Sequence, residues 1–219
     1  MTPARSRFWT EDRHLSIFLV MVVAIILVPT FLPVGLLARL ISDALTSVML
    51  ISGALAVTGR PRTVLIVSLI TGATLLVRWA SWVFATSSLA VWGEIATLAT
   101  LGILCYVVLR LVLRRGPITT HRIEGAIAVY LLLGLTWAHA YGLVALWHPG
   151  AFTGAVDDKG PVRWTYYYSF VTLTTMGYGD IMPVHPLARA LAVLEALTGQ
   201  LYLAIMLARL VSLQLQSRR

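Results

Sequence analysis

Six apolar runs constrain the fold of this chain more than any other feature of its sequence. A helix needs about 20 residues, at about 1.5 Å each, to cross a hydrocarbon core of about 30 Å. Hydrophobic residues make up 58% of the chain and charged residues 12%, too few charges to cover a water-soluble surface. We therefore expect an all-α membrane protein with six spans, over about Leu15–Leu36, Leu37–Val57, Thr63–Ala85, Leu89–Leu113, Ile118–Trp147 and Leu187–Leu213.

Basic residues lie mostly at the ends of these runs. The formal net charge of +8 is compatible with nucleic-acid binding, but this placement is typical of the positive-inside rule. With six spans, one side of the membrane keeps only Arg39, Lys159, Arg163 and Arg189. The other side holds the larger group: Arg5, Arg7, Arg13, Arg60, Arg62, Arg114, Arg115, Arg122, Arg218 and Arg219.

This asymmetry predicts that both termini are cytoplasmic and that the polar stretch Pro149–Arg163 is an exposed extracellular loop. A cleaved signal peptide is the competing interpretation of the first run. No small-residue cleavage site follows that run, so an uncleaved first span in a plasma-membrane protein is favoured.

The run Thr174–Asp180, with the sequence TTMGYGD, lies between the last two spans. Rings of backbone carbonyls replace the hydration shell of a potassium ion when the backbone is nearly straight and alternates in handedness. Glycine suits the positions where φ must be positive, which are Gly177 and Gly179. We expect Thr175 to add a hydroxyl ring at the inner mouth and Asp180 to cap the outer end. We expect the side chains of Met176 and Tyr178 to point outward into protein.

The segment before this run, residues 164–174, fits a short helix that enters from outside. A helix of this length cannot cross a bilayer, so it must be re-entrant and buried in protein. Its C-terminal end would direct a negative partial charge at the centre of the membrane, where a dehydrating cation needs it. Tyr166, Tyr167 and Tyr168 would form an aromatic girdle, with hydroxyls available to brace the run Thr174–Asp180, which we call the filter.

The stretch from about Ile123 to Leu213 resembles the pore module of tetrameric potassium channels: outer helix, pore helix, TTxGYGD filter and inner helix. The resemblance implies that the carbonyls of Thr175, Met176, Gly177 and Tyr178 and the Thr175 hydroxyl coordinate K+, with Gly179 completing the filter. It implies supporting roles for Thr174, Asp180, Tyr167 and Tyr168. It also implies a hinge at Gly199 and a cavity lined by Gln200, Leu203 and Leu207.

Two residues depart from the family pattern. Val171 stands where some bacterial members have a glutamate that braces the filter aspartate, so Asp180 needs another partner, for which Tyr167 is the candidate. Met176 is less usual than valine at its position, although its side chain is expected to face away from the ions.

The resemblance and the geometry of the filter together predict a homotetramer. One chain supplies one filter strand and cannot encircle an ion, so four chains are required. K+ and membrane lipid are the expected partners, with no cofactor besides the permeating ion. The expected domains are a cytoplasmic N-terminus (1–14), a four-helix transmembrane domain (15–115) and the pore domain (116–219).

The fourth span does not have the arginines at every third position that voltage sensing requires. Arg110, Arg114 and Arg115 cluster at its cytoplasmic end, where they act as anchors in the headgroups. We therefore expect little voltage dependence. Asp43, Arg78 and Glu94 are expected at matching depth in the outer half of the membrane and should form a structural charge cluster, because an isolated charge is costly in lipid.

Glu195 and His139 are expected behind the filter, where they could meet. A proton sensor is one interpretation, and a satisfied buried hydrogen bond is the favoured one. The chain ends shortly after the last span, so no cytoplasmic sensor domain is expected. Gating would come from the filter, from bending near Gly199, from lipid or from a separate regulatory subunit.

Several other functions are weighed against a selective channel. A weakly selective cation pore is the main alternative. A potassium-binding transporter tends to show paired broken helices and internal repeats, which are not visible in the sequence. A non-conducting partner subunit is disfavoured by the intact filter, and no nucleophile–base or metal-ligand arrangement supports an enzyme.

Overall fold

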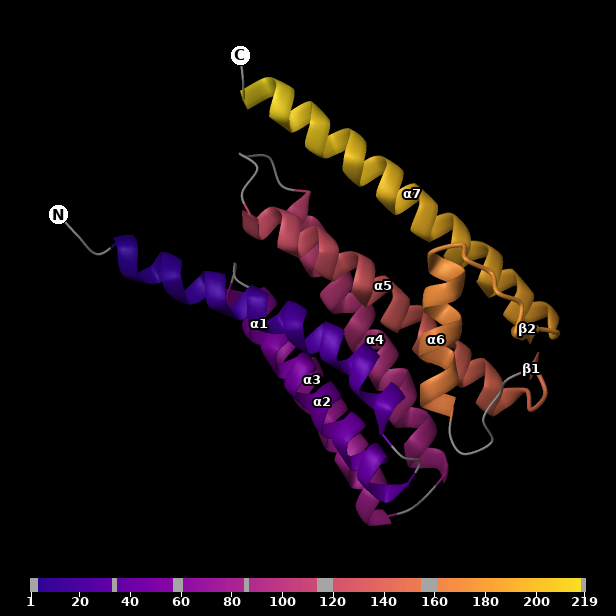
Figure 1. The fold of residues 1–219 in the computed structure, drawn as a ribbon. Helices are drawn as coiled ribbons and strands as arrows, with labels where there is room; N and C mark the ends of the chain where they lie inside the picture. The colour runs from indigo at the N-terminus through magenta and orange to yellow at the C-terminus, as the bar shows by residue number, and fades with distance from the viewer. Residues whose placement is uncertain are drawn as a thin grey trace. The chain divides into compact units, whose positions relative to one another are not determined.

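A computed structural model describes residues 4–32, 35–56, 61–84, 87–113, 120–154 and 161–217. The described chain is almost entirely helical (Figure 1). Its elements are α1 (Ala4–Phe31), α2 (Leu36–Ala56), α3 (Pro61–Phe84), α4 (Ser87–Val112), α5 (Thr120–Trp147), β1 (Phe152–Gly154), α6 (Pro161–Leu173), β2 (Ile181–Pro183) and α7 (Pro186–Ser217).

Five of these helices, α2, α3, α4, α5 and α7, are long and apolar enough to cross a membrane, among the residues that the structure describes. The helix α1 begins at Ala4, well before the expected span, and its apolar part, Ser16–Val28, is shorter. Six spans were expected, and the first of them stays a prediction. The helix α6 has 13 residues, too few to cross a bilayer.

The chain divides into two compact units, Met1–Leu132 and Leu133–Arg219, and the division falls inside α5. The domain boundary expected at residues 115 and 116 lies outside the described residues, as do the predictions on Arg60, Arg114, Arg115, Lys159, Arg218 and Arg219. That boundary stays a prediction. Each unit is described by itself below.

In the first unit, α1 packs on α2, and α3 packs on both α2 and α4. Gly53 of α2 lies in a tightly packed part of this unit. A Cβ built on it would lie 2.9 Å from the Phe18 ring of α1 and 3.1 Å from Leu104 of α4. Phe18 and Leu104 are both fully buried. The absent side chain therefore lets three helices share one core.

A buried ion pair joins α2 to α3. Arg78 of α3 binds the carboxylate of Asp43 of α2, which also accepts a hydrogen bond of 2.7 Å from the Trp82 indole. A second guanidinium nitrogen of Arg78 donates to Thr97 Oγ1 of α4 at 3.4 Å. The structure thus brings Asp43 and Arg78 together and places Glu94 on α4, one turn before Thr97.

In the second unit, the stretch Pro149–Arg163 was expected to be an exposed loop. Pro149, Gly150, Thr153 and Gly154 are exposed, and the expectation is wrong for the two residues between them. Ala151 and Phe152 are buried. Strand β1 pairs antiparallel with β2, with Phe152 opposite Pro183 and Gly154 opposite Ile181. The loop is held here because Phe152 packs into an aromatic cluster with Tyr141, Trp164 and Tyr168.

Candidate functional site

The segment between α6 and β2 has an alternating backbone. Thr175, Gly177 and Gly179 have φ angles of 59°, 58° and 79°, whereas Met176 and Tyr178 between them do not have positive φ. Thr175 is the one non-glycine residue with positive φ among the described residues, and a β-branched side chain makes that conformation strained. Left- and right-handed residues in alternation keep the carbonyls on one side of a straight strand, as a filter requires.

The filter amides cap the C-terminal end of α6. The carbonyl of Val171 accepts hydrogen bonds from the backbone N–H groups of Met176 at 2.9 Å and Gly177 at 3.4 Å, and the carbonyl of Thr172 accepts one from Thr175 at 2.9 Å. The last carbonyls of a helix have no partner within it, so these bonds satisfy them. They also tie the position of the filter directly to the position of α6.

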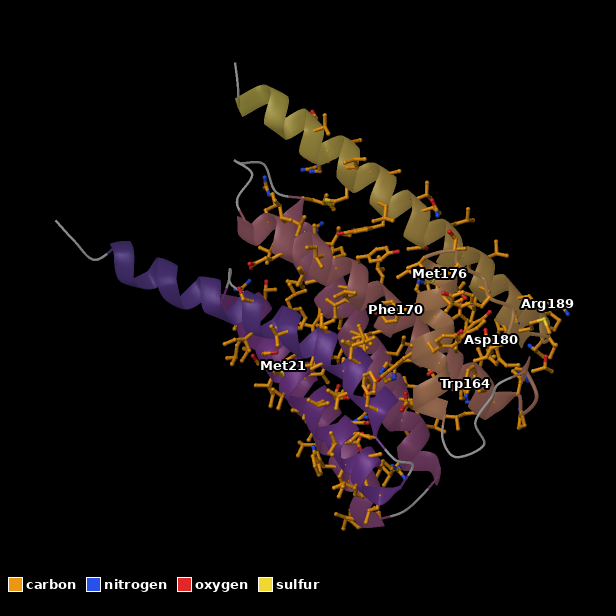
Figure 2. All side chains as sticks on the ribbon, viewed as in Figure 1. Met21, Trp164, Phe170, Met176, Asp180 and Arg189 are labelled. Carbon is orange, nitrogen blue, oxygen red and sulfur yellow. The ribbon has the colours of Figure 1, made fainter. Side chains whose placement is uncertain are left out.

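After this cap the chain runs back beside α6, as the labels of Met176 and Asp180 show in Figure 2. Asp180 thereby comes within reach of Tyr167, and hydrogen bonding to this carboxylate raises the pKa of the Tyr167 hydroxyl. Asp180 also meets β1, since a Cβ built on Gly154 would lie 1.9 Å from the Asp180 carbonyl oxygen.

The other two tyrosines of α6 face protein. Tyr168 stacks edge-on against Tyr141 of α5, with ring centroids 4.9 Å apart, and against Phe152 at 5.3 Å. Tyr166 lies edge-on to the His139 ring at 5.8 Å, with its hydroxyl 3.4 Å from Nε2. Both tyrosines are buried, so they fix the rotation of α6 about its axis.

Two glycines let α6 approach its neighbours closely. A Cβ built on Gly199 of α7 would lie 2.3 Å from the carbonyl oxygen of Leu173, the last residue of α6. A Cβ on Gly134 of α5 would lie 2.6 Å from the Phe170 ring. Gly199 therefore has a packing role directly beneath the filter, and its role as a hinge stays a prediction.

Replacing Gly199 with alanine should shift α6 and lower the stability of the second unit by about 1–3 kcal/mol, the usual effect of overpacking. The backbone of Leu173 cannot yield as a flexible side chain would. The melting temperature and the potassium flux of this variant should both be lower than those of the wild-type protein. Gly142→Ala is the control, because no atom lies within 4 Å of a Cβ built there. Equal melting temperatures for the two variants would contradict the packing role.

At the inner end of the filter, α7 contacts Thr175 directly. The Gln200 amide nitrogen donates to Thr175 Oγ1 at 3.0 Å, and that hydroxyl donates to the Thr174 carbonyl at 2.7 Å. Leu203 and Leu207, further along α7, are 50% and 66% exposed in the single chain. Gln200 is thus the residue of the expected cavity lining that touches the filter.

Glu195 of α7 is completely buried, and its carboxyl lies 2.5 Å from both the Tyr141 hydroxyl of α5 and the Ser169 hydroxyl of α6. His139 contacts Tyr166 instead. The favoured expectation for Glu195, a satisfied buried hydrogen bond, matches these contacts. Its partners Tyr141 and Ser169 were missed, because each lies far from Glu195 in sequence and neither carries a recognisable motif.

Comparison with known proteins finds a family to which this arrangement is similar. A family model described as "Ion channel" matches residues 129–215, which contain α6, the filter and most of α7. This part of the chain is similar to the ion channel family. The match indicates a channel rather than an enzyme and, together with the apolar helices, a multi-pass membrane protein.

Two curated relatives match part of the chain. The two pore potassium channel c of Oryza sativa subsp. japonica is 36% identical over 83 residues, which are 38% of this chain and 17% of that protein. The inward rectifier potassium channel Kirbac3.1 of Paramagnetospirillum magnetotacticum is 36% identical over 81 residues, 35% of this chain and 24% of that protein. The chain therefore spans less than a quarter of the length of these relatives. No solved structure matches the chain.

Proposed function

We propose that the chain is one subunit of a homotetrameric, potassium-selective channel that conducts K+ passively across the membrane. The observation that carries this proposal is the alternating backbone at Thr175, Gly177 and Gly179. In that conformation the carbonyls of Thr175, Met176, Gly177 and Tyr178 and the Thr175 hydroxyl can replace the hydration shell of the ion. Both curated relatives are potassium channels by name, which supports this ion.

The exposed side chains of the single chain support a symmetric assembly. One strand offers carbonyls from one side only, so four copies around an axis are needed to surround an ion. Met176 and Tyr178 were expected to point into protein, yet they are 61% and 65% exposed here. In a tetramer the neighbouring subunits would cover them, while Leu203 and Leu207 would face the cavity.

The proposed topology has six spans in the plasma membrane, with both termini in the cytoplasm and α6 re-entrant from outside. The 13 residues of α6 support re-entry, because such a helix cannot cross the bilayer. Residues 149–163 would then be extracellular. The few arginines along α4, with Arg110 in its last turn, support little voltage dependence.

Reconstituted protein tests this proposal in two steps. A mass measurement in detergent or nanodiscs should give four copies of the chain per particle. Liposomes loaded with K+ should then release it down its gradient at a rate that rises in proportion to the number of tetramers. A different copy number would contradict the geometry, and absence of any flux would contradict the channel.

A further inference from the structure

Glu195 joins three helices behind the filter. Its two carboxyl oxygens lie 2.5 Å from the Tyr141 hydroxyl of α5 and 2.5 Å from Ser169 Oγ of α6. Ser169 Oγ also lies 2.7 Å from the carbonyl oxygen of Gly134 on α5. Glu195 and Ser169 are both completely buried, so no water replaces these contacts. Four polar groups therefore form a linear chain of contacts: the Tyr141 hydroxyl, the Glu195 carboxyl, the Ser169 hydroxyl and the Gly134 carbonyl.

The number of hydrogens available for these contacts decides whether the Glu195 carboxyl group is protonated. A serine hydroxyl has one hydrogen and can donate only one full hydrogen bond. If Ser169 donates to Glu195, its oxygen lies 2.7 Å from the Gly134 carbonyl oxygen with no hydrogen between them. If Ser169 donates to Gly134, the contact with Glu195 needs a hydrogen from the carboxyl group. Only a protonated Glu195 supplies a hydrogen to every contact.

Burial gives a second reason for the neutral form. An isolated carboxylate is very costly to remove from water unless a cation is paired with it, whereas a neutral acid needs only hydrogen bonds. Two titratable groups that face Glu195 are tyrosines, Tyr141 of α5 and Tyr168 of α6, and neither is a cation at any pH. His139, also on α5, lies against Tyr166.

We propose that Glu195 is a neutral carboxylic acid that positions α6, and with it the filter, through a directed chain of three hydrogen bonds. Tyr141 donates to one oxygen of Glu195, the Glu195 O–H donates to Ser169, and Ser169 donates to the Gly134 carbonyl. The role rests on the proposed function, since the filter is what Glu195 positions. Ser169 lies two residues before Val171, whose carbonyl holds the filter amides.

This brace differs from the one implied by the family resemblance. There a glutamate on the pore helix binds the filter aspartate, and here that position is Val171. The carboxyl group comes instead from the inner helix, α7. It fixes the placement of α6 between α5 and α7 and does not bind the filter aspartate. Glu195 does not touch the permeating ion, so it is a positioning residue.

Ion selectivity tests the positioning role. Glu195→Gln should keep the permeability ratio of K+ to Na+, because the amide accepts from Tyr141 and donates to Ser169 as the acid does. Glu195→Leu and Ser169→Ala should lower the ratio by about tenfold, because each leaves buried groups without partners. Thr198→Val is the control, since among the described residues the Thr198 hydroxyl donates to the Leu194 carbonyl of its own helix and to no other group.

The permeability ratio comes from a reversal potential, which does not depend on how much protein folds. Wild-type ratios in both Glu195→Leu and Ser169→Ala would overturn the positioning role, even if these variants unfold at lower temperature. An equal loss in Thr198→Val would overturn it too. A Glu195→Gln variant as damaged as Glu195→Leu would contradict the neutral acid.

Infrared spectroscopy tests the protonation independently of conduction. At neutral pH, subtracting the spectrum of the Glu195→Gln variant from that of the wild-type protein should leave the carbonyl stretch of a protonated carboxylic acid. The Tyr141→Phe substitution should shift this band, because it removes a hydrogen bond to the acid. Absence of the band would overturn the neutral acid. A wild-type protein that shows the band but does not select K+ would instead contradict the proposed function, so the two failures are distinguishable.

Discussion

Replacing Gly177 with alanine should reduce potassium flux to that of empty liposomes. Gly177 has a φ of 58°, a conformation that costs an L-residue about 1–2 kcal/mol. A tetramer would carry this cost four times at one level of the pore. The strain is relieved when the peptide rotates, and that rotation turns a carbonyl away from the ion path. The measurement is K+ release from liposomes that contain equal numbers of tetramers.

Gly150→Ala is the matched control for this variant. Gly150 also has positive φ, 83°, and neither glycine has any atom within 4 Å of a built Cβ. The two substitutions therefore add the same kind of strain, one in the filter and one in the turn after α5. We expect Gly150→Ala to conduct as wild type does. Normal flux through Gly177→Ala would refute the role given to the filter carbonyls.

The second large effect is expected in the first unit. Arg78→Met should lower the free energy of unfolding by about 3 kcal/mol, because removing one partner of a buried ion pair leaves the other charge uncompensated. Asp43 would keep only the indole hydrogen bond from Trp82. Thermal unfolding of the detergent-solubilised protein, followed by circular dichroism, measures the change.

Two further variants make this test specific. Arg110→Met removes a cation that lies over the exposed Tyr106 ring, 5.0 Å from its centroid, and should have little effect. The double variant Asp43→Asn/Arg78→Met leaves neither charge buried and should recover part of the lost stability. If Arg78→Met melted at the same temperature as Arg110→Met, the ion pair would not stabilise the bundle.

Most of the helical framework could be predicted from hydropathy, because long apolar runs leave few alternatives to a helix in lipid. The observed α2, α3, α4 and α5 begin and end within two residues of the expected spans. The N-terminal helix could not be placed this way. Its charged residues end the apolar signal, although the helix itself continues back to Ala4.

The filter was also visible in the sequence, since glycines at alternate positions predict alternating handedness. The sequence did not predict the positive φ of Thr175, because β-branched residues rarely adopt it. Here the N–H of Thr175 donates to the Thr172 carbonyl and the N–H of Met176 donates to the Val171 carbonyl, so the strand is held on both sides of the Thr175 Cα. Local propensity is thus overridden by the hydrogen bonds at the end of α6.

Contacts between distant residues were the least predictable part of the site. Tyr141, Ser169 and Glu195 come from three helices, and no spacing rule joins them. The close approach of Gly199 to Leu173 depends on how α7 crosses α6, so the sequence could not predict it, and the hinge expected at Gly199 stays a prediction. The sequence did not predict strand β1 at Phe152, because its pairing with β2 involves only three residues on each side.

The measurement that tests the central claim most directly is the reversal potential of the purified wild-type protein in a planar bilayer, with K+ on one side and Na+ on the other at equal concentration. A filter of aligned carbonyls predicts a reversal potential far from zero, with the sign that opposes K+ flow, because the permeability ratio of K+ to Na+ sets this potential. A reversal potential near zero would mean equal permeability to both ions and would contradict potassium selectivity.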